Sequence, residues 1–143
     1  MEKIKVKYVS DDVLRMEKIT KGDWIDLRSS VDLELKAGDS AIIPLGVCIQ
    51  LPSGYEALLA PRSSTFKNYG LIQTNSIGVI DETYCGDGDV WGFPVYATRD
   101  TNIKVNDRIC QFRIIEHQPE LEIEEVEYLG NEDRNGFGST GKE

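Results

Sequence analysis

Three short segments of the chain carry residue types that bind phosphate chains and activate water. The first spans residues 60–64 and reads APRSS, so that Arg62, Ser63 and Ser64 follow a proline where a strand-like run ends. A guanidinium offers a planar fork of donors, and the start of a helix offers unpaired N–H groups, both of which bind phosphate oxygens. Taken alone, the segment also fits a capped helix with Arg62 in a structural ion pair.

The second segment, residues 75–84, reads NSIGVIDETY and ends in two carboxylates and a tyrosine. Asp81 directly follows Val79 and Ile80, and partial burial beside this apolar pair would keep its carboxylate a competent base near neutral pH. Such a base can deprotonate an attacking water. The alternative is that Asp81 and Glu82 only begin a solvated turn, which the spacing alone does not exclude.

The third segment, residues 136–141, reads GFGSTG and lies in a tail with few apolar side chains. Residues 129–143 contain four glycines and only two large apolar residues, Leu129 and Phe137, too few to order the tail by burial. A flexible glycine loop can close over a ligand, with backbone amides on phosphate oxygens and the aromatic ring on a base. A frayed terminus is the alternative explanation.

The elements that must hold these segments are predicted to be strands. Residues 3–8 alternate lysine with apolar side chains, as in an edge strand. Short strand-like runs recur from Trp24 onward, separated by turn clusters and with almost no helical periodicity. This pattern predicts one all-β domain, a sandwich or jelly roll, with a short helix at Ser63–Asn68. The later predicted strands are 32–35, 41–51, 55–60, 70–74, 77–80, 90–97, 108–115 and 121–128.

The charge of the chain limits its partners. Acidic residues outnumber basic residues by 25 to 16, which gives a formal charge of −9. This balance argues against binding a nucleic-acid backbone, for which a basic stripe is expected. A bound triphosphate would also need local arginines and a divalent cation to offset the long-range repulsion.

Cysteine spacing and hydropathy bear on the compartment. Cys48, Cys85 and Cys110 form no C-x-x-C pair, which predicts reduced thiols in the cytoplasm that serve as small packing groups. No apolar run approaches the roughly 18 residues of a membrane span, so no membrane partner is expected. The single histidine, His117, is expected at the surface, far from the three segments.

Together the segments resemble the five motifs of the trimeric dUTP diphosphatase (dUTPase) family, in order and across nearly the whole chain. The matching stretches are residues 23–27, 61–64, 75–86, 106–111 and 136–141. The resemblance implies a jelly-roll subunit of the β-clip type over residues 1–128 and a flexible C-terminal lid over residues 129–143. It also implies a homotrimer whose active sites lie at subunit interfaces, with the tail of a neighbour as lid.

The activity implied by the resemblance is hydrolysis of dUTP to dUMP and pyrophosphate, which lowers dUTP and supplies dUMP for dTMP synthesis. Water would attack the α-phosphorus in line, and Mg²⁺ would supply positive charge that the acidic chain lacks. Asp81 resembles the catalytic base of the family, and Asp26 resembles the carboxylate that steadies the metal through water. No covalent enzyme intermediate is needed.

The resemblance also implies which residues bind the nucleotide. The uracil edge would be recognised by the Asn75 amide and by backbone groups at Gly78, Val79 and Ile80, while Tyr84 would pack beneath the deoxyribose and exclude a 2′-hydroxyl. Contacts to the phosphates would come from Arg62, Ser63, Ser64, Gln111 and Arg134. The lid would consist of Phe137, Gly138 and Ser139.

Several positions depart from the family pattern. Thr83 stands where a second aspartate is usual, and Asn106 replaces a glycine, which is tolerable because asparagine accepts a left-handed turn. Arg134 lies only three residues before Phe137, which puts its contact with the γ-phosphate in doubt. Trp91 and Phe93 lie close after the second segment, so either core packing or a role in covering the uracil in place of Phe137 is open. The short fifth motif, together with the aromatic residues Trp91 and Phe93, resembles a subgroup of the family found in Gram-positive bacteria and their phages.

Two rival functions remain. A dCTP deaminase shares the fold and the phosphate-binding logic, but the order of Asn75, Asp81 and Tyr84 and the aromatic tail match the diphosphatase better. Some phage members of the family bind regulatory proteins, with the nucleotide as a switch. Such a partner would add to catalysis. An unexplained surface insert would favour it, and this chain has only the short turn at residues 87–89.

Overall fold

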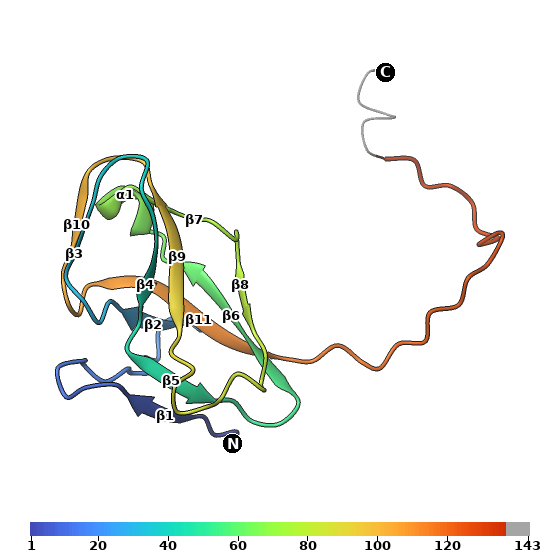
Figure 1. The fold of residues 1–143 in the computed structure, drawn as a ribbon. Helices are drawn as coiled ribbons and strands as arrows, with labels where there is room; N and C mark the ends of the chain where they lie inside the picture. Colours follow the sequence, from blue (N-terminus) through green and yellow to red (C-terminus); the bar gives the residue numbers. More distant parts are fainter. Residues whose placement is uncertain (137–143) are drawn as a thin grey trace.

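The computed structural model describes residues 1–136, and this range contains eleven strands and one five-residue helix. The all-β jelly-roll prediction is confirmed, and Figure 1 shows the strands gathered into one body from which the C-terminal segment extends. In chain order the elements are β1 (Lys5–Tyr8), β2 (Ile25–Arg28), β3 (Leu33–Leu35), β4 (Ser40–Pro44), β5 (Val47–Gln50), β6 (Tyr55–Pro61), α1 (Thr65–Tyr69), β7 (Leu71–Gln73), β8 (Gly78–Ile80), β9 (Gly92–Ala97), β10 (Thr101–Ile103) and β11 (Arg108–Glu116).

The strands form four small antiparallel sheets. The largest has the order β2-β11-β6-β8, and a second has the order β4-β9-β7. Strand β1 pairs with β5, and β10 pairs with β3. In the largest sheet β11 is central and long, so it pairs with β2 over one half and with β6 over nearly its whole length. Strands β2 and β8 therefore lie at opposite edges of this sheet.

The core forms where the inner faces of these sheets meet. Alternation along β9 sends Phe93, Val95 and Ala97 inward, each with no exposed surface, as a half-buried strand requires. Trp91 and Phe112 meet edge to face with ring centroids 5.2 Å apart, joining the approach to β9 with β11. Burial of side chains of this size stabilises the fold by roughly 1.5–3 kcal/mol each.

One local prediction is corrected in its bounds and two others are confirmed. The helix was predicted at Ser63–Asn68 and lies at Thr65–Tyr69, where Ser64 occupies the N-cap position without a side-chain capping bond. Asn106 has a φ of 72°, as expected for a residue that replaces glycine in a left-handed turn. Strand β1 confirms the predicted edge strand, because it pairs with β5 alone.

The predicted strand at residues 121–128 is absent: this stretch has no regular structure, and its side chains are exposed. Leu121, Ile123 and Tyr128 are 67%, 95% and 81% exposed. The alternation of apolar and acidic residues was correct as a pattern, but a strand needs a partner strand to satisfy its backbone groups. Within residues 1–136 this stretch has no such partner and runs away from the body after β11 (Figure 1).

The three cysteines differ in environment. Cys48 and Cys110 are buried, and burial raises the pKa of the Cys110 thiol well above its usual range. Cys85 is exposed, so the prediction that all three serve in packing is wrong for this residue. All three are free thiols. No helix in the described part of the chain has the length and apolar composition to cross a membrane.

Candidate active site

The first cluster of predicted site residues forms where β6 ends. The backbone N–H of Arg62 donates to Thr65 Oγ1 over 2.8 Å, and the Thr65 hydroxyl donates to the carbonyl oxygen of Ile109 over 2.9 Å. Thr65 is buried, so these bonds fix the segment against β11. Arg62 Nη1 also donates to Ser64 Oγ over 3.3 Å. Thr65 was not among the predicted site residues, and only its place beside the PRSS motif hinted at it.

Asp26 on β2 joins this cluster through arginine. Arg62 Nε donates to Asp26 Oδ1 over 2.9 Å, while Arg108 Nη1 lies 3.8 Å from Asp26 Oδ2. Gln111 lies opposite Asp26 in the β11–β2 pairing, and its Nε2 donates to the Pro61 carbonyl oxygen over 3.1 Å. Arg62, Ser64, Asp26 and Gln111, predicted from three separate motifs, therefore lie together; this group is called the arginine cluster below.

The arginine cluster suits a magnesium ion that is held by other ligands. Its one carboxylate, Asp26, already accepts a hydrogen bond from Arg62 on Oδ1 and faces Arg108 on Oδ2. No group of three His, Cys, Asp or Glu side chains suited to a metal occurs in the described residues. Mg²⁺ prefers phosphate oxygens and retained waters over an all-protein cage. The donors present therefore fit contact through water, as predicted for Asp26, and do not fit direct coordination.

The second cluster surrounds Asp81, which directly follows β8. Thr83 donates to Asp81 Oδ2 twice, from its hydroxyl over 2.5 Å and from its backbone N–H over 2.9 Å. These hydrogen bonds hold the pKa of the Asp81 carboxyl below its usual value, and burial opposes them only weakly. The Asp81 side chain is 58% exposed, so the prediction that burial beside Val79 and Ile80 would raise its basicity is wrong. Thr83 instead orients the carboxylate, because both of its hydrogen bonds go to Oδ2 and none goes to Oδ1.

Strand β8 presents the residues predicted to recognise uracil. It is an edge strand that pairs only with β6, so one side of its backbone is open to hydrogen bonding. A Cβ at Gly78 would lie 3.0 Å from Leu59 Cβ, which explains why a glycine suits this close approach to β6. Tyr84 is exposed, and its hydroxyl donates to the Val90 carbonyl oxygen over 3.2 Å, which fixes the ring beside the strand.

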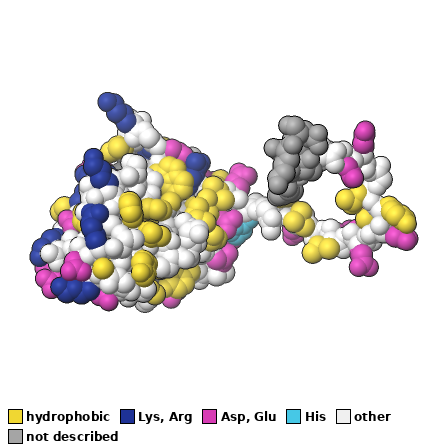
Figure 2. Space-filling view, turned by 90° about the horizontal axis from the view of Figure 1, so that it is seen from above, with side chains coloured by type: hydrophobic (Ala, Val, Ile, Leu, Met, Phe, Trp, Pro, Cys, Tyr) yellow, Lys and Arg dark blue, Asp and Glu magenta, His cyan; other side chains and the backbone are white. Residues whose placement is uncertain are grey.

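His117 lies in this second cluster, contrary to the prediction that it is far from the motifs. Its Nε2 is 4.0 Å from Asp81 Oδ1, and its Nδ1 is 3.5 Å from Glu82 Oε1. In Figure 2 the histidine side chain lies among acidic side chains where the C-terminal segment leaves the body. Sequence reasoning missed this contact because β6 pairs with both β8 and β11 and so joins segments far apart in the chain.

Trp91 and Phe93, the alternative covers for the uracil, are 1% and 0% exposed. Both belong to the hydrophobic core, so the packing alternative is confirmed for them. Arg134 lies in the exposed segment after β11, away from any regular element. Phe137, Gly138 and Ser139 lie outside the described residues.

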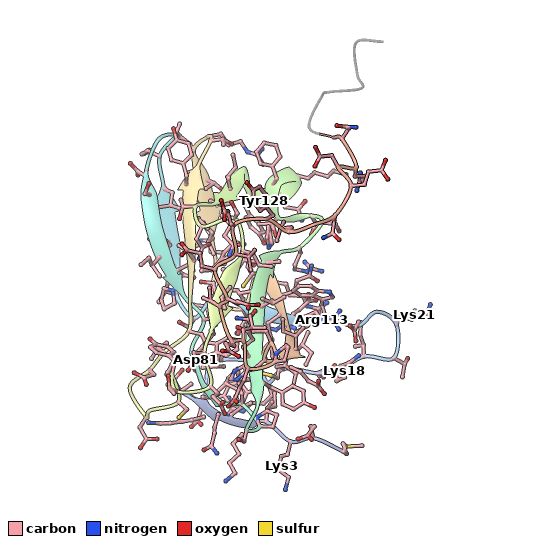
Figure 3. All side chains as sticks on the ribbon, turned by 90° about the vertical axis from the view of Figure 1, so that its right-hand side faces the viewer. Lys3, Lys18, Lys21, Asp81, Arg113 and Tyr128 are labelled. Carbon is pink, nitrogen blue, oxygen red and sulfur yellow. The ribbon has the colours of Figure 1, made fainter. Side chains whose placement is uncertain are left out.

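The two clusters lie at opposite ends of β6. Asp81 follows Ile80, which pairs with Ala57 near the start of β6, whereas Arg62 follows its last residue. At about 3.4 Å per residue, the positions from Ala57 to Arg62 span roughly 17 Å. Figure 3 shows Asp81 towards one side of the body; Arg113, labelled towards the other, lies on β11 and does not belong to the arginine cluster. Asp81 and the arginine cluster of one chain therefore follow opposite ends of β6.

Comparisons with known proteins bear on this arrangement. A family model described as dUTPase matches residues 23–141. The SPbeta prophage-derived deoxyuridine 5′-triphosphate nucleotidohydrolase YosS of Bacillus subtilis (strain 168) is 56% identical over 138 residues, 96% of this chain and 97% of that protein. The dUTPase of Staphylococcus bacteriophage 80alpha, solved with dUPNHPP, has a TM-score of 0.80 at 22% identity, with 99% of each chain covered. A variant dUTPase from phage phi11 of S. aureus, which coordinates a structural Mg(II) ion, has a TM-score of 0.77 at 19% identity, over 89% of this chain and 98% of that one.

The fold and the two clusters define the class of this protein. It is an all-β jelly roll with guanidinium and hydroxyl groups at one end of β6 and an oriented carboxylate at the other. The family model and the full-length similarity to the Bacillus protein then fix the family. The chain belongs to the dUTPase family.

Proposed function

We propose that this chain hydrolyses dUTP to dUMP and pyrophosphate, by attack of water on the α-phosphorus. The support is membership of the dUTPase family and 56% identity to a deoxyuridine 5′-triphosphate nucleotidohydrolase over nearly the full length of both proteins. The observation in the structure that carries the proposal is the oriented carboxylate of Asp81. Thr83 occupies Oδ2 with two hydrogen bonds and leaves Oδ1 to take a proton from water.

Asp81 is the catalytic base in this proposal. A carboxylate with a low pKa is fully ionised at neutral pH, so it is always in the form that accepts a proton. It is a weak base for the same reason, and most of the acceleration must then come from positioning and from charge stabilisation on the phosphates. This division of work suits a reaction with no covalent enzyme intermediate.

The pyrimidine is recognised by the open edge of β8. Uracil carries a donor between two acceptors, which an extended backbone can match with alternating C=O and N–H groups. Gly78, Val79 and Ile80 would provide this edge, with the amide of Asn75 at the preceding turn. Tyr84 would pack beneath the deoxyribose, where its fixed ring leaves no room for a 2′-hydroxyl and so excludes ribonucleotides.

The arginine cluster binds the phosphates in this proposal. Arg62 uses Nε for Asp26, and its Nη1 contacts Ser64 and the Arg108 carbonyl oxygen. Its Nη2 would therefore face the phosphate oxygens, beside the hydroxyls of Ser63 and Ser64. Gln111 is held by the Pro61 carbonyl oxygen and would contact the α-phosphate region. When bound with the nucleotide, Mg²⁺ would neutralise charge on the phosphates, with Asp26 steadying it through water.

The active form in this proposal is a homotrimer whose sites combine the Asp81 cluster of one copy with the arginine cluster of another. The support is the separation of roughly 17 Å along β6, which places the two clusters of one chain at opposite ends of this strand. Cyclic symmetry repeats the same pair of surfaces around the ring, so three copies give three equal sites. Residues 129–143, including Arg134 and the lid residues Phe137, Gly138 and Ser139, would close such a site from a neighbouring copy.

Complementation between two inactive variants tests this assembly. Arg62→Ala and Asp81→Asn should each abolish most pyrophosphate release as pure proteins. When both variants are co-expressed, a site is intact if its Asp81 cluster comes from an Arg62→Ala copy and its arginine cluster from an Asp81→Asn copy. Random mixing therefore restores about one quarter of the wild-type activity. Mixed trimers with no activity above the pure variants would contradict the shared site, while leaving dUTP hydrolysis by the wild type intact.

The products distinguish the proposed reaction from the rival one. Wild-type protein supplied with dUTP and Mg²⁺ should release pyrophosphate, and dCTP should yield no ammonia. Release of ammonia from dCTP would establish the deaminase instead. The three free thiols support a reducing compartment, and we extend the proposal to the cytoplasm on that ground.

A regulatory partner is the second candidate function. The 80alpha protein belongs to phage dUTPases described as controlling the transfer of virulence genes by a G protein-like mechanism. In this chain Asp87 and Gly88 of the turn at residues 87–89 are exposed, and the turn lies close after the Asp81 cluster, where a partner could sense the bound nucleotide. Pull-down from host lysate with and without a dUTP analogue tests this role. Nucleotide-dependent capture of a partner by the wild type, and its loss when residues 87–89 are replaced, would support the role.

A further inference from the structure

His117 occupies a position between two acidic side chains from another part of the chain. It is the first residue after β11, and its backbone N–H donates to the Gly54 carbonyl oxygen over 2.9 Å. Its ring lies with Nε2 4.0 Å from Asp81 Oδ1 and Nδ1 3.5 Å from Glu82 Oε1. Three segments therefore meet here: the turn before β6, the end of β8 and the end of β11.

The two contacts of the ring favour one protonation state. Both ring nitrogens face carboxylate oxygens, which only accept hydrogen bonds. A neutral imidazole has one N–H and one lone pair, so it can satisfy one carboxylate and must turn a lone pair towards the other. The doubly protonated imidazolium has an N–H for each. At these distances only a positively charged His117 can attract both carboxylates.

When His117 loses its positive charge, its contact with Glu82 is favoured over its contact with Asp81. Glu82 is fixed from its other oxygen, because the backbone N–H of Gly54 donates to Oε2 over 3.2 Å. The Glu82 side chain is also less exposed than that of Asp81, and its distance to the ring is shorter. A neutral His117 would therefore keep its single N–H on Glu82 and release Asp81.

The charged groups that face His117 in the described structure are few. Asp81 and Glu82 approach from the end of β8, and the turn before β6 contributes the backbone of Gly54. On its own strand the preceding residue is Glu116, which lies opposite Tyr55 of β6. All the nearby charges are negative, so each of them would attract a positively charged ring.

We propose that His117 is a positioning residue that sets whether Asp81 Oδ1 is available to the attacking water. Protonated His117 bridges Asp81 and Glu82 and competes for Oδ1; neutral His117 stays on Glu82 and leaves Oδ1 free. Turnover then rises with pH as His117 loses its proton. This inference depends on the proposed role of Asp81 as the base, and it adds a pH control to that role.

The electrostatics of Asp81 act in the same direction. The two hydrogen bonds from Thr83 lower the pKa of the Asp81 carboxyl most, and the charge of His117 lowers it further. A carboxylate with a lower pKa is a weaker base, so loss of the charge on His117 strengthens the base as well as releasing it. Histidine is the side chain that changes charge near neutral pH, which places the effect in the working range of the protein.

The test compares kcat and KM for dUTP in the wild type and in His117→Gln from about pH 5.5 to about pH 9. Both proteins meet the same substrate ionisation, so the ratio of their kcat values isolates the histidine. We expect this ratio, variant over wild type, to fall by about threefold or more as pH rises, with KM little changed. Superimposable profiles, or an equal loss of kcat at every pH, would overturn the inference.

Glu82→Gln provides a second variant in case His117→Gln folds poorly. It removes one of the two negative charges that contact the ring, so the rise of kcat should move to lower pH. Glu116→Gln is the matched control: it removes a neighbouring charge that neither ring nitrogen contacts, so the rise of kcat should move less than in Glu82→Gln. An unmoved rise in Glu82→Gln would contradict the inference.

Asp81→Asn separates this inference from the proposed function. If that variant keeps wild-type turnover, Asp81 is not the base and the proposed mechanism fails first. If it loses turnover while His117→Gln keeps the wild-type pH profile, the base stands and only the role of His117 fails.

Discussion

Arg62 Nε donates to Asp26 Oδ1 over 2.9 Å, and this bond reaches across the end of β11. Arg62 follows β6 and Asp26 lies on β2, so the strand between them is bridged by one guanidinium. The same arginine faces the Arg108 carbonyl oxygen over 3.4 Å. Both side chains are about one quarter exposed, which leaves part of the guanidinium open to a ligand. The bond therefore fixes the direction of Arg62 before any phosphate binds.

Arg62→Lys tests this preorganisation. Lysine keeps the charge but replaces a fork of donors with a single ammonium, which cannot bind Asp26 and a phosphate in the same geometry. We expect KM for dUTP to rise about tenfold and the free energy of unfolding to fall by about 1–2 kcal/mol. Steady-state kinetics and urea denaturation measure the two effects.

Arg113→Lys is the control for Arg62→Lys. Arg113 Nη1 also lies 2.9 Å from a carboxylate, that of Asp23, but both of these side chains are more exposed. Exposed pairs contribute about 0–1 kcal/mol, so stability and KM should stay close to the wild type. Equal effects of the two substitutions would show that the Asp26 bond has no special role in phosphate binding.

Asp81→Asn tests the catalytic base. The amide is nearly isosteric but cannot take a proton from water, so kcat should fall by about 10²–10⁴-fold. The affinity for a non-hydrolysable dUTP analogue should stay within a few-fold of the wild type, because Asp81 is not among the residues proposed to bind the nucleotide. Asp87→Asn, on the exposed turn nearby, should leave both quantities unchanged. Near-normal turnover of Asp81→Asn would remove Asp81 from the mechanism.

Thr83→Val tests how Thr83 controls the ionisation of Asp81. The substitution removes the hydroxyl that donates to Oδ2 and keeps the backbone N–H, so the pKa of Asp81 should rise towards its ordinary value. In the wild type the folded pKa lies below the unfolded one. The ionised carboxylate therefore adds stability that is present above the unfolded pKa and is lost as pH falls through the folded pKa.

Thr83→Val should shrink that contribution and move the acid limb of kcat to higher pH. Thr83→Ser keeps the hydroxyl and is the control, with an acid limb like that of the wild type. The pH dependence of kcat and of acid unfolding gives both readouts. An acid limb that is identical in Thr83→Val and Thr83→Ser would show that the backbone N–H alone sets the pKa.

The short-range patterns in the sequence predicted the local structure well. Alternation located the edge strand at Lys5–Tyr8, and the PRSS motif located the turn into α1, since both depend on neighbours in the chain. The same reasoning failed for residues 121–128, where the alternation is present but no partner strand lies within residues 1–136. Alternation of side chains predicts which face of a strand is buried, but it does not predict whether a partner strand is present.

The sequence predicted which residues form the site better than it predicted their contacts and their exposure. The arginine cluster was found because each member belongs to a local motif. The contact of His117 with Asp81 depends on strands β8 and β11 pairing with the same region of β6, which no local pattern encodes. The exposure of Asp81 was also missed, because apolar neighbours in sequence point to alternate sides of a strand and need not cover the residue that follows them.

Trp91 separates core packing from nucleotide binding in a last experiment. Its ring is buried against Phe112, so Trp91→Phe should lower the free energy of unfolding by about 1–3 kcal/mol, and Trp91→Ala by about 3–5 kcal/mol. For protein that remains folded, kcat and KM for dUTP should be unchanged, because the ring reaches no surface that a nucleotide could contact. Tyr84→Ala is the opposite case, an exposed aromatic that should raise KM and leave stability nearly unaltered. If Trp91→Phe raised KM at unchanged stability, the indole would have to leave the core and cover the uracil during catalysis.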